Sequence, residues 1–195
     1  MIPSERFRAN KAIDFDDWVK ARKLGVTATE VAKASTPKGF EEVVGGYFEP
    51  VEIPDNRYME FGRRSEGPIS MWLKSAHDVM PNEWLIAADN PRHLATPDGL
   101  SLDHKVISEI KTTGRDFGDK IPVQYGRQIQ WQIYVTGADF CWFTWMLRVE
   151  TRDGDFQPGW IEPKVTKVLP SKDTIQDLIA VADKLWDIKR DSLGE

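Results

Sequence analysis

The sequence predicts a single domain of mixed helix and sheet, in the α/β or α+β class, over residues 1–195. Helical periodicity dominates the first third of the chain and its C-terminal segment, and strand-like segments separated by turn residues lie between them. The sequence contains no internal repeat and no linker. The composition, 41% hydrophobic and 29% charged, is that of a globular protein with enough residues for one core.

The N-terminal part of the chain is expected to be helical. Apolar residues at helical spacing predict a first helix from about Asp14 to Lys23, which Gly25 ends. Thr27 and Glu30 have the spacing of a capping box. We therefore expect a second, shorter helix to begin at this point.

The segment from Ser35 to Asn56 contains prolines and glycines that interrupt the helical period. We expect it to be a loop with one short element. The period resumes from Arg57 to Ser75, and one face of this predicted helix has a single acidic residue, Glu66, among apolar neighbours. Pro68 lies within this helix and is a candidate kink.

Three strand-like segments follow, and proline and asparagine turns separate them. They are Trp84–Ala88, His93–Ala95 and Lys105–Thr112. An antiparallel meander would connect them with short turns. A helix is then predicted from Pro122 to about Val135, because Pro122 suits a first turn and Gly137 suits a helix end.

The C-terminal part is predicted to be a hairpin followed by a helix. Phe140–Val149 is an aromatic segment typical of a long buried strand. The Arg-Asp-Gly-Asp sequence at 152–155 predicts a turn, and Trp160–Leu169 predicts the returning strand. We expect Asp173 to cap a final amphipathic helix that ends near Arg190.

Composition and charge exclude several classes of protein. The 26 basic and 31 acidic residues give a net charge of −5, which argues against a protein that coats polyanions. No apolar run is long enough to cross a bilayer, and the start of the sequence lacks the apolar core of a signal peptide. We therefore expect a cytoplasmic protein with no membrane partner. The one cysteine, Cys141, excludes an internal disulfide and an iron-sulfur cluster, and its apolar neighbours predict a buried thiol.

One stretch has the residue types of a metal-dependent hydrolase. Asp98 lies in a Pro-Asp-Gly turn, and eleven residues later Glu109 and Lys111 flank Ile110 on a predicted strand. Because residues i and i+2 of a strand point the same way, both charged side chains share one face. Two carboxylates and an ammonium that a hairpin brings together can hold Mg²⁺ and act on a hydrolytic water. Taken singly, Asp98 fits an ordinary Asp-Gly turn and Lys111 fits a solvated strand lysine.

Several motifs resemble, in order and spacing, the phage lambda exonuclease group, also called YqaJ-like viral recombinases, of the PD-(D/E)XK nuclease superfamily. The motifs are Arg22-Lys-Leu-Gly-Val-Thr-Ala-Thr-Glu-Val, Met59-Glu-Phe-Gly-Arg-Arg-Ser-Glu-Gly-Pro, Ala95-Thr-Pro-Asp-Gly-Leu, Glu109-Ile-Lys, Tyr125-Gly-Arg-Gln-Ile-Gln and Val135-Thr-Gly. The resemblance covers about residues 18–145. It implies a restriction-endonuclease-like core, with a central mixed sheet flanked by helices.

The resemblance also implies a metal site. Asp98, Glu109 and the backbone carbonyl of Ile110 would bind Mg²⁺, for which Mn²⁺ can substitute, because a hard cation prefers oxygen ligands. Glu66, on the preceding helix, would complete or bridge a second metal position.

Further residues would act on the substrate by the same resemblance. Lys111 would orient or help to deprotonate the attacking water, or offset charge in the transition state. Gln128 and Tyr125, one helical turn apart, would position Lys111 and the scissile phosphate. The remaining three, Arg22, Thr27 and Thr29, would receive a terminal 5′ phosphate. Thr29 replaces a serine that is common in the family, and the hydroxyl is retained.

The function implied by the resemblance is that of a Mg²⁺-dependent 5′-to-3′ exodeoxyribonuclease, which leaves single strands for recombination. Its partners would be ends of double-stranded DNA, a single-strand annealing protein and further copies of the chain, in a bacterial host with a phage or prophage gene. The residues themselves indicate only metal-assisted phosphodiester hydrolysis. Two alternatives stay open: an endonuclease or single-strand nuclease on the same fold, and a catalytically idle DNA-binding recombination module.

Overall fold

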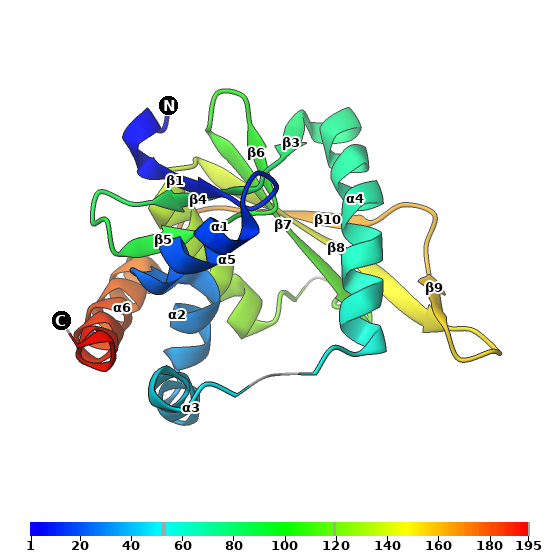
Figure 1. Ribbon diagram of the computed structural model, residues 1–195. Helices are drawn as coiled ribbons and strands as arrows, with labels where there is room; N and C mark the ends of the chain where they lie inside the picture. The colour runs from blue at the N-terminus through cyan, green and yellow to red at the C-terminus, as the bar shows by residue number, and fades with distance from the viewer. Residues whose placement is uncertain (52–53, 119, 195) are drawn as a thin grey trace.

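Two sheets with helices around them form the structure, a computed structural model that describes residues 1–51, 54–118 and 120–194 (Figure 1). The smaller sheet has the strand order β1 (Phe7–Asn10), β4 (Trp84–Ala87), β5 (His93–Ala95) and β2 (Val26–Thr27). The larger sheet has the order β10 (Lys164–Val168), β8 (Phe140–Glu150), β7 (Val106–Thr113), β6 (Gly99–Ser101) and β3 (Val79–Pro81), and β9 (Phe156–Pro158) pairs with β8. Both sheets are mixed, because β2 is parallel to β5 and β7 is parallel to β8. The predicted mixed α/β class is confirmed.

The helices lie where the sequence periodicity places them, with two additions. They are the short 3-10 helix η1 (Ser4–Arg6), α1 (Phe15–Lys23), α2 (Ala28–Ala34), α3 (Pro37–Phe48), α4 (Arg57–His77), α5 (Val123–Thr136) and α6 (Lys172–Leu193). The two additions are η1 and α3. The capping box at Thr27 and Glu30 begins α2 as predicted. Gly137 ends α5 in the left-handed conformation, as expected of a glycine at this position. α4 continues through Pro68.

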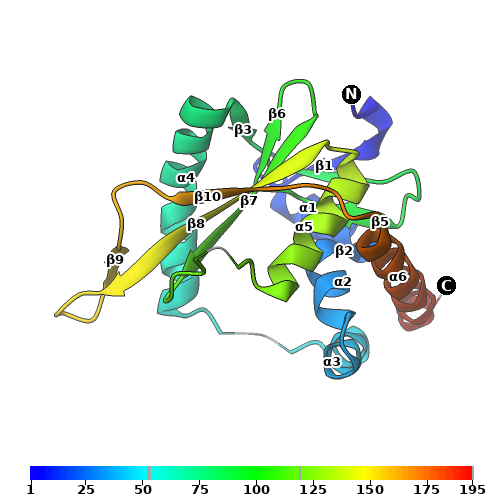
Figure 2. The same ribbon diagram turned by 180° about the vertical axis from the view of Figure 1, so that it is seen from behind.

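The β7–α5–β8 unit forms the centre of the fold. Ile107 of β7 and Phe143 of β8 are fully buried and belong to the same hydrophobic cluster as Trp131 of α5. Ile110 points to the other face of β7 and belongs to a different cluster, with Leu73 of α4. Strand alternation therefore places α5 and α4 on opposite faces of the larger sheet, as both views show (Figures 1 and 2). The residues at positions 109 and 111 share the face of Ile107, toward α5.

The predicted loop between Ser35 and Asn56 is wrong over most of its described length, because residues 37–48 form α3. Thr36 caps this helix by accepting a hydrogen bond from the Gly39 amide at 3.2 Å. Pro37 occupies the first turn, where no backbone donor is needed. Apolar residues of α3 pack into the main core, so tertiary contacts outweigh the glycines that interrupt the pattern. Positions 52 and 53 of the predicted loop lie outside the described residues.

The predicted antiparallel meander is also wrong, because its strands belong to different sheets. β4 and β5 pair with each other in the smaller sheet, whereas β7 pairs with β6 and β8 in the larger one. The Asn82 amide stabilises the crossover by donating to the carbonyls of Pro97 at 2.9 Å and Trp84 at 3.1 Å. Hydrophobic alternation predicts strands, but it does not specify their partners.

Two C-terminal boundaries differ from expectation. The predicted returning strand Trp160–Leu169 is observed only from Lys164, as β10, and the short strand β9 precedes it. The last helix begins after Ser171 and not after Asp173. Ser171 suits this position because its amide donates to the Gln130 side chain at 2.7 Å, which joins the start of α6 to α5.

Candidate functional site

Glu109 is the centre of a hydrogen-bond cluster on the α5 face of β7. It is 1% exposed, and both carboxylate oxygens have partners. Its Oε1 accepts from Lys111 Nζ and from Gln128 Nε2, the latter at 2.6 Å, and its Oε2 accepts from Gln132 Nε2 at 2.6 Å. A buried carboxylate needs this many donors because burial removes its hydration. The predicted pairing of Glu109 with Lys111 on one face of the strand is present.

Asp98 lies next to this cluster at the start of β6. Its side chain extends the strand pairing, since Oδ2 accepts from the Ile110 amide at 2.6 Å, while its own amide donates to the Ser108 carbonyl at 3.0 Å. Burial, followed by the charge of Glu109, raises the pKa of Asp98 well above its usual range. Two carboxyl groups therefore share a space in which one cationic side chain, Lys111, opposes their charge.

Lys111 remains an ammonium in these surroundings. Burial lowers the pKa of Lys111, but the charges of Glu109 and Asp98 outweigh burial and raise it overall. The Lys111 Nζ also lies 5.3 Å from the ring centroid of Tyr125. The structure thus places Tyr125 against Lys111 and Gln128 against Glu109, whereas both were expected to position Lys111 and the scissile phosphate.

Gln132 is a member of the cluster that the sequence analysis missed. It follows Gln128 by one helical turn, so both amides project from the same face of α5 toward Glu109. The four-residue spacing between Gln128 and Gln132 could have predicted that both side chains reach the same site. Gln132 is 1% exposed, and its Oε1 has no hydrogen-bond partner in the described structure. Thr96 Oγ1, which lines the same cavity, is likewise buried without a partner there.

A cavity of about 210 Å³ joins this cluster to the other predicted residues. Glu66 lines it from α4, and Arg22, Thr27 and Thr29 line it from α1 and from the start of α2. The set of predicted residues that lines it comprises Arg22, Thr27, Thr29, Glu66, Asp98, Glu109, Lys111 and Gln128. The sequence analysis did not identify the further lining residues Lys11, Trp18, Asn82 and Glu83, which come from segments without a distinctive pattern.

Arg22, Thr27 and Thr29 form what we call the α1–α2 corner. The Arg22 guanidinium lies 4.4 Å from the ring centroid of Trp18, and the Thr29 side chain is exposed. Thr27 is buried, and its hydroxyl donates to Glu30 Oε2 at 2.6 Å. The Thr27 hydroxyl hydrogen is therefore engaged within the protein, which leaves Arg22 and Thr29 as the side-chain donors of the corner.

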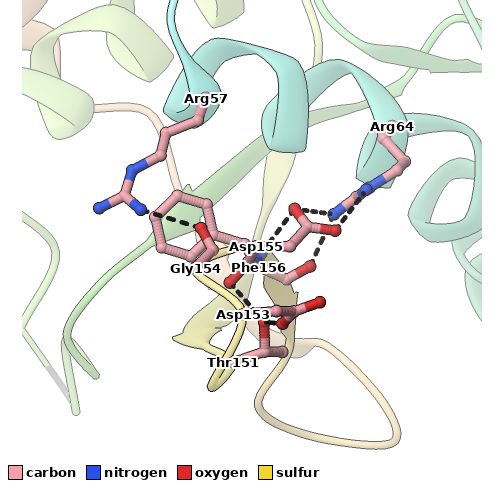
Figure 3. Close-up of polar contacts among 7 residues, drawn as sticks. All are labelled: Arg57, Arg64, Thr151, Asp153, Gly154, Asp155 and Phe156. Carbon is pink, nitrogen blue, oxygen red and sulfur yellow. Dashed lines mark hydrogen bonds and ion pairs between the residues drawn. The ribbon is translucent and has the colours of Figure 1, made fainter.

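α4, which contributes Glu66, is attached at its N-terminal half to the turn between β8 and β9. Arg57 donates to the Gly154 carbonyl at 2.9 Å, and Arg64 contacts the Asp155 carboxylate and the Phe156 carbonyl (Figure 3). These two arginines lie two turns apart on α4 and contact the turn side by side. The contact made by Arg64 lies only two residues before Glu66.

The acidic residues of the cavity supply the oxygen ligands that a divalent cation prefers. The carboxyl groups of Asp98 and Glu109 lie close enough for their negative charges to repel each other. That donor set fits the expected Mg²⁺ or Mn²⁺. The side chains are nevertheless arranged around Lys111 and the two glutamine amides. In the described part of the chain, no group of three or more His, Cys, Asp or Glu side chains is placed to hold an ion in this conformation. Metal binding would thus require Glu109 to exchange some of its present partners.

A family model for the YqaJ-like viral recombinase domain matches residues 17–139. The match includes the α1–α2 corner and the whole Glu109 cluster. No curated protein matches the chain significantly. Among the described residues, no helix is long and apolar enough to cross a membrane.

Solved structures of exonucleases have the same fold. An alkaline exonuclease from Laribacter hongkongensis, LHK-Exo, has a TM-score of 0.69 at 20% identity, over 91% of this chain and 94% of its own. The same enzyme in complex with dAMP has a TM-score of 0.70 at 21% identity, with the same coverage. A phage-related exonuclease from Haemophilus somnus 129PT has a TM-score of 0.65 at 12% identity, over 87% of this chain and 96% of its own. At these identities the similarity establishes the fold.

Proposed function

Because the chain belongs to the YqaJ-like viral recombinase family, we propose that it is a metal-dependent exonuclease that degrades one strand of linear double-stranded DNA from a 5′ end. The observation that carries the proposal is a single cavity that contains both the Glu109–Lys111 cluster and the α1–α2 corner. The first supplies hydrolytic groups, and the second supplies donors for a terminal phosphate. The exonuclease relatives with this fold support the same activity.

The proposed metal ligands are Asp98, Glu109 and the Ile110 carbonyl, with Glu66 for a second position. Bound Mg²⁺, or Mn²⁺ in its place, would lower the pKa of the attacking water and neutralise charge on the phosphate. Lys111, as an ammonium, offsets negative charge on the phosphoryl oxygens in the transition state. Its raised pKa favours this role over that of a general base.

The other polar residues of the cavity hold these groups in place. Gln128 and Gln132 orient the Glu109 carboxylate from two successive turns of α5. Tyr125 confines the Lys111 side chain through its ring. Arg22 and Thr29 would bind the 5′ phosphate, and that contact would fix the distance from the strand end to the hydrolysed bond.

The biological setting follows from the family. We propose that residues 1–195 act as one domain on DNA ends, in the cytoplasm of a bacterial host, with a gene of phage or prophage origin. The single strands produced would be substrates for an annealing protein. Further copies of the chain around the duplex would keep the enzyme on its substrate.

The direct test is incubation of the protein with 5′-phosphorylated linear duplex and Mg²⁺. We expect release of nucleotides from the 5′ ends, with no release by the Lys111→Ala variant. Absence of release by the unmodified protein, or equal release by the variant, would refute the proposal. A duplex labelled at its 3′ end reports the polarity, because a 5′-to-3′ enzyme removes that label last.

The two alternatives give different results in related assays. An endonuclease or single-strand nuclease would cut a covalently closed circle or isolated single strands, which an enzyme specific for duplex ends leaves intact. An idle DNA-binding module would show little Mg²⁺ or Mn²⁺ affinity by calorimetry. The complete set of acidic residues and Lys111 in one cavity favours an active enzyme over that module.

A further inference from the structure

A second carboxylate, Glu30, lies directly behind the α1–α2 corner. Its Oε2 accepts from the Thr27 amide at 2.7 Å and from the Thr27 hydroxyl at 2.6 Å. Its charge also acts on Arg22: burial lowers the pKa of that guanidinium, and Glu30 opposes the effect. Glu30 is therefore a carboxylate whose charge acts on Arg22.

The other oxygen of Glu30 is held from the far end of the chain. Lys189, near the end of α6, is 7% exposed. Its Nζ donates to Glu30 Oε1 at 2.9 Å and to the Gly25 carbonyl at 2.6 Å. The ring of Tyr47 covers this ammonium, with 5.0 Å between Nζ and the ring centroid. Lys189 lies well outside the residues that the family model matches.

This arrangement determines which cation neutralises Glu30. Lys189 is in direct contact with Glu30, whereas no carboxylate in the described part of the chain lies within 4 Å of the Arg22 guanidinium. If Lys189 lost its charge, Glu30 would lack the cation that now contacts it, and Arg22, on which the charge of Glu30 already acts, could take its place. A guanidinium paired with Glu30, which does not line the cavity, would be less available to an anion bound there.

We propose that Lys189 is a positioning residue that occupies Glu30, and that it thereby keeps Arg22 available for the terminal phosphate of the DNA. This inference rests on the proposed function of the α1–α2 corner. It assigns to α6 a part in discriminating phosphorylated from unphosphorylated ends. The same contact to the Gly25 carbonyl also fixes the position of β2, from which Thr27 starts α2.

The test compares two DNA duplexes that differ only in a 5′ phosphate or a 5′ hydroxyl. For each protein we would measure kcat and KM with Mg²⁺, and Kd by fluorescence anisotropy with Ca²⁺ in place of Mg²⁺. We expect Lys189→Met to reduce the preference for the phosphorylated end about tenfold, in KM and Kd more than in kcat, because one charge-assisted contact is lost. Lys184→Met, an exposed lysine of the same helix, is the matched control and should retain the full preference.

A double variant separates positioning from a purely structural role. In Lys189→Met with Glu30→Gln, no carboxylate remains to capture Arg22, so we expect the preference to return. Lys189→Arg, which keeps the charge, should also retain it. If Lys189→Met is too unstable to assay, Lys189→Gln serves the same purpose, because it removes the charge and keeps a donor for the Gly25 carbonyl.

The outcomes distinguish this inference from the proposed function. An unchanged preference in the Lys189 variants, or an equal loss on both duplexes that the double variant does not restore, would overturn the role of Lys189. Absence of cleavage by the unmodified protein would instead refute the nuclease proposal. Restoration of the preference by the double variant is the result that we expect.

Discussion

Glu109 is a buried carboxylate that lines the cavity, and Glu30 is a partly buried one next to the α1–α2 corner; the structure holds them in similar ways. Each accepts three hydrogen bonds, and each has one lysine among its donors. The lysine of Glu109 lies two residues away on the same strand, whereas the lysine of Glu30 is separated from it by 159 residues. The comparison teaches that the proposed hydrolytic group is paired with a lysine close in the sequence, while the proposed phosphate-binding corner depends on a lysine from the far end of the domain.

The largest expected effect is on the local lysine. Lys111→Ala removes the one ammonium that faces Glu109 and Asp98, so we expect nucleotide release to fall about 10³-fold, with a smaller change in KM. Lys105→Ala, an exposed lysine just before β7, is the control and should have normal activity. Steady-state kinetics on linear duplex provide the measurement. A variant that retains more than a tenth of the activity would show that charge at this position is dispensable.

The long-range lysine should affect stability more than chemistry. Lys189→Met leaves Glu30 without its buried partner, and breaking such a pair costs about 3 kcal/mol in the free energy of unfolding. Urea denaturation would measure the loss, with Lys184→Met as the control. We expect the double change with Glu30→Gln to recover part of it, because no unpaired charge then remains. Equal stability of Lys189→Met and the unmodified protein would show that water or Arg22 already compensates Glu30 fully.

The same contrast explains what could be predicted from the sequence. Asp98, Glu109 and Lys111 lie in one hairpin, so strand alternation alone places the pair on one face, and the family motifs add Glu66 and Gln128. Most helices were also predictable, because each has its own period and cap signal.

Contacts between segments far apart in the sequence have no motif, period or cap that would predict them. Nothing near Lys189 indicates that it binds Gly25 and Glu30, and a buried lysine is rare enough that a surface position was the default expectation. The assignment of β4 and β7 to different sheets and the formation of α3 were unpredictable for the same reason. Strand partners and the packing of a glycine-containing helix depend on residues far away in the sequence.

Gln132 provides a finer test of how Glu109 is held. Gln132→Met removes the donor to Oε2 and leaves Gln128 and Lys111 on Oε1. Outer partners of this kind commonly contribute about tenfold to activity, so we expect a fall of that size in kcat with little change in KM. Gln124→Met, an exposed position on the first turn of α5, is the control. If both variants have full activity, Gln128 and Lys111 suffice to orient the carboxylate.

The smallest expected effect on stability has the opposite sign, because it concerns a group that destabilises the fold. The pKa of Asp98 is raised in the folded protein by burial and by Glu109. A carboxyl whose folded pKa exceeds its unfolded value binds its proton more tightly when folded. Stability is therefore lost as the pH rises from the unfolded pKa through the raised one, and the penalty persists at neutral pH.

Asp98→Asn removes that ionisation, and we expect it to stabilise the protein by about 1 kcal/mol at neutral pH while it abolishes cleavage. The difference should disappear at a pH below the unfolded pKa, where Asp98 is protonated in both states. Thermal unfolding across a pH series, with and without Mg²⁺, would measure both parts. Mg²⁺ should raise the Tm of the unmodified protein more than that of Asp98→Asn, because the variant lacks one of the proposed carboxylate ligands. A variant that is less stable than the unmodified protein at neutral pH would mean that the hydrogen bond from the Ile110 amide outweighs the cost of the buried charge.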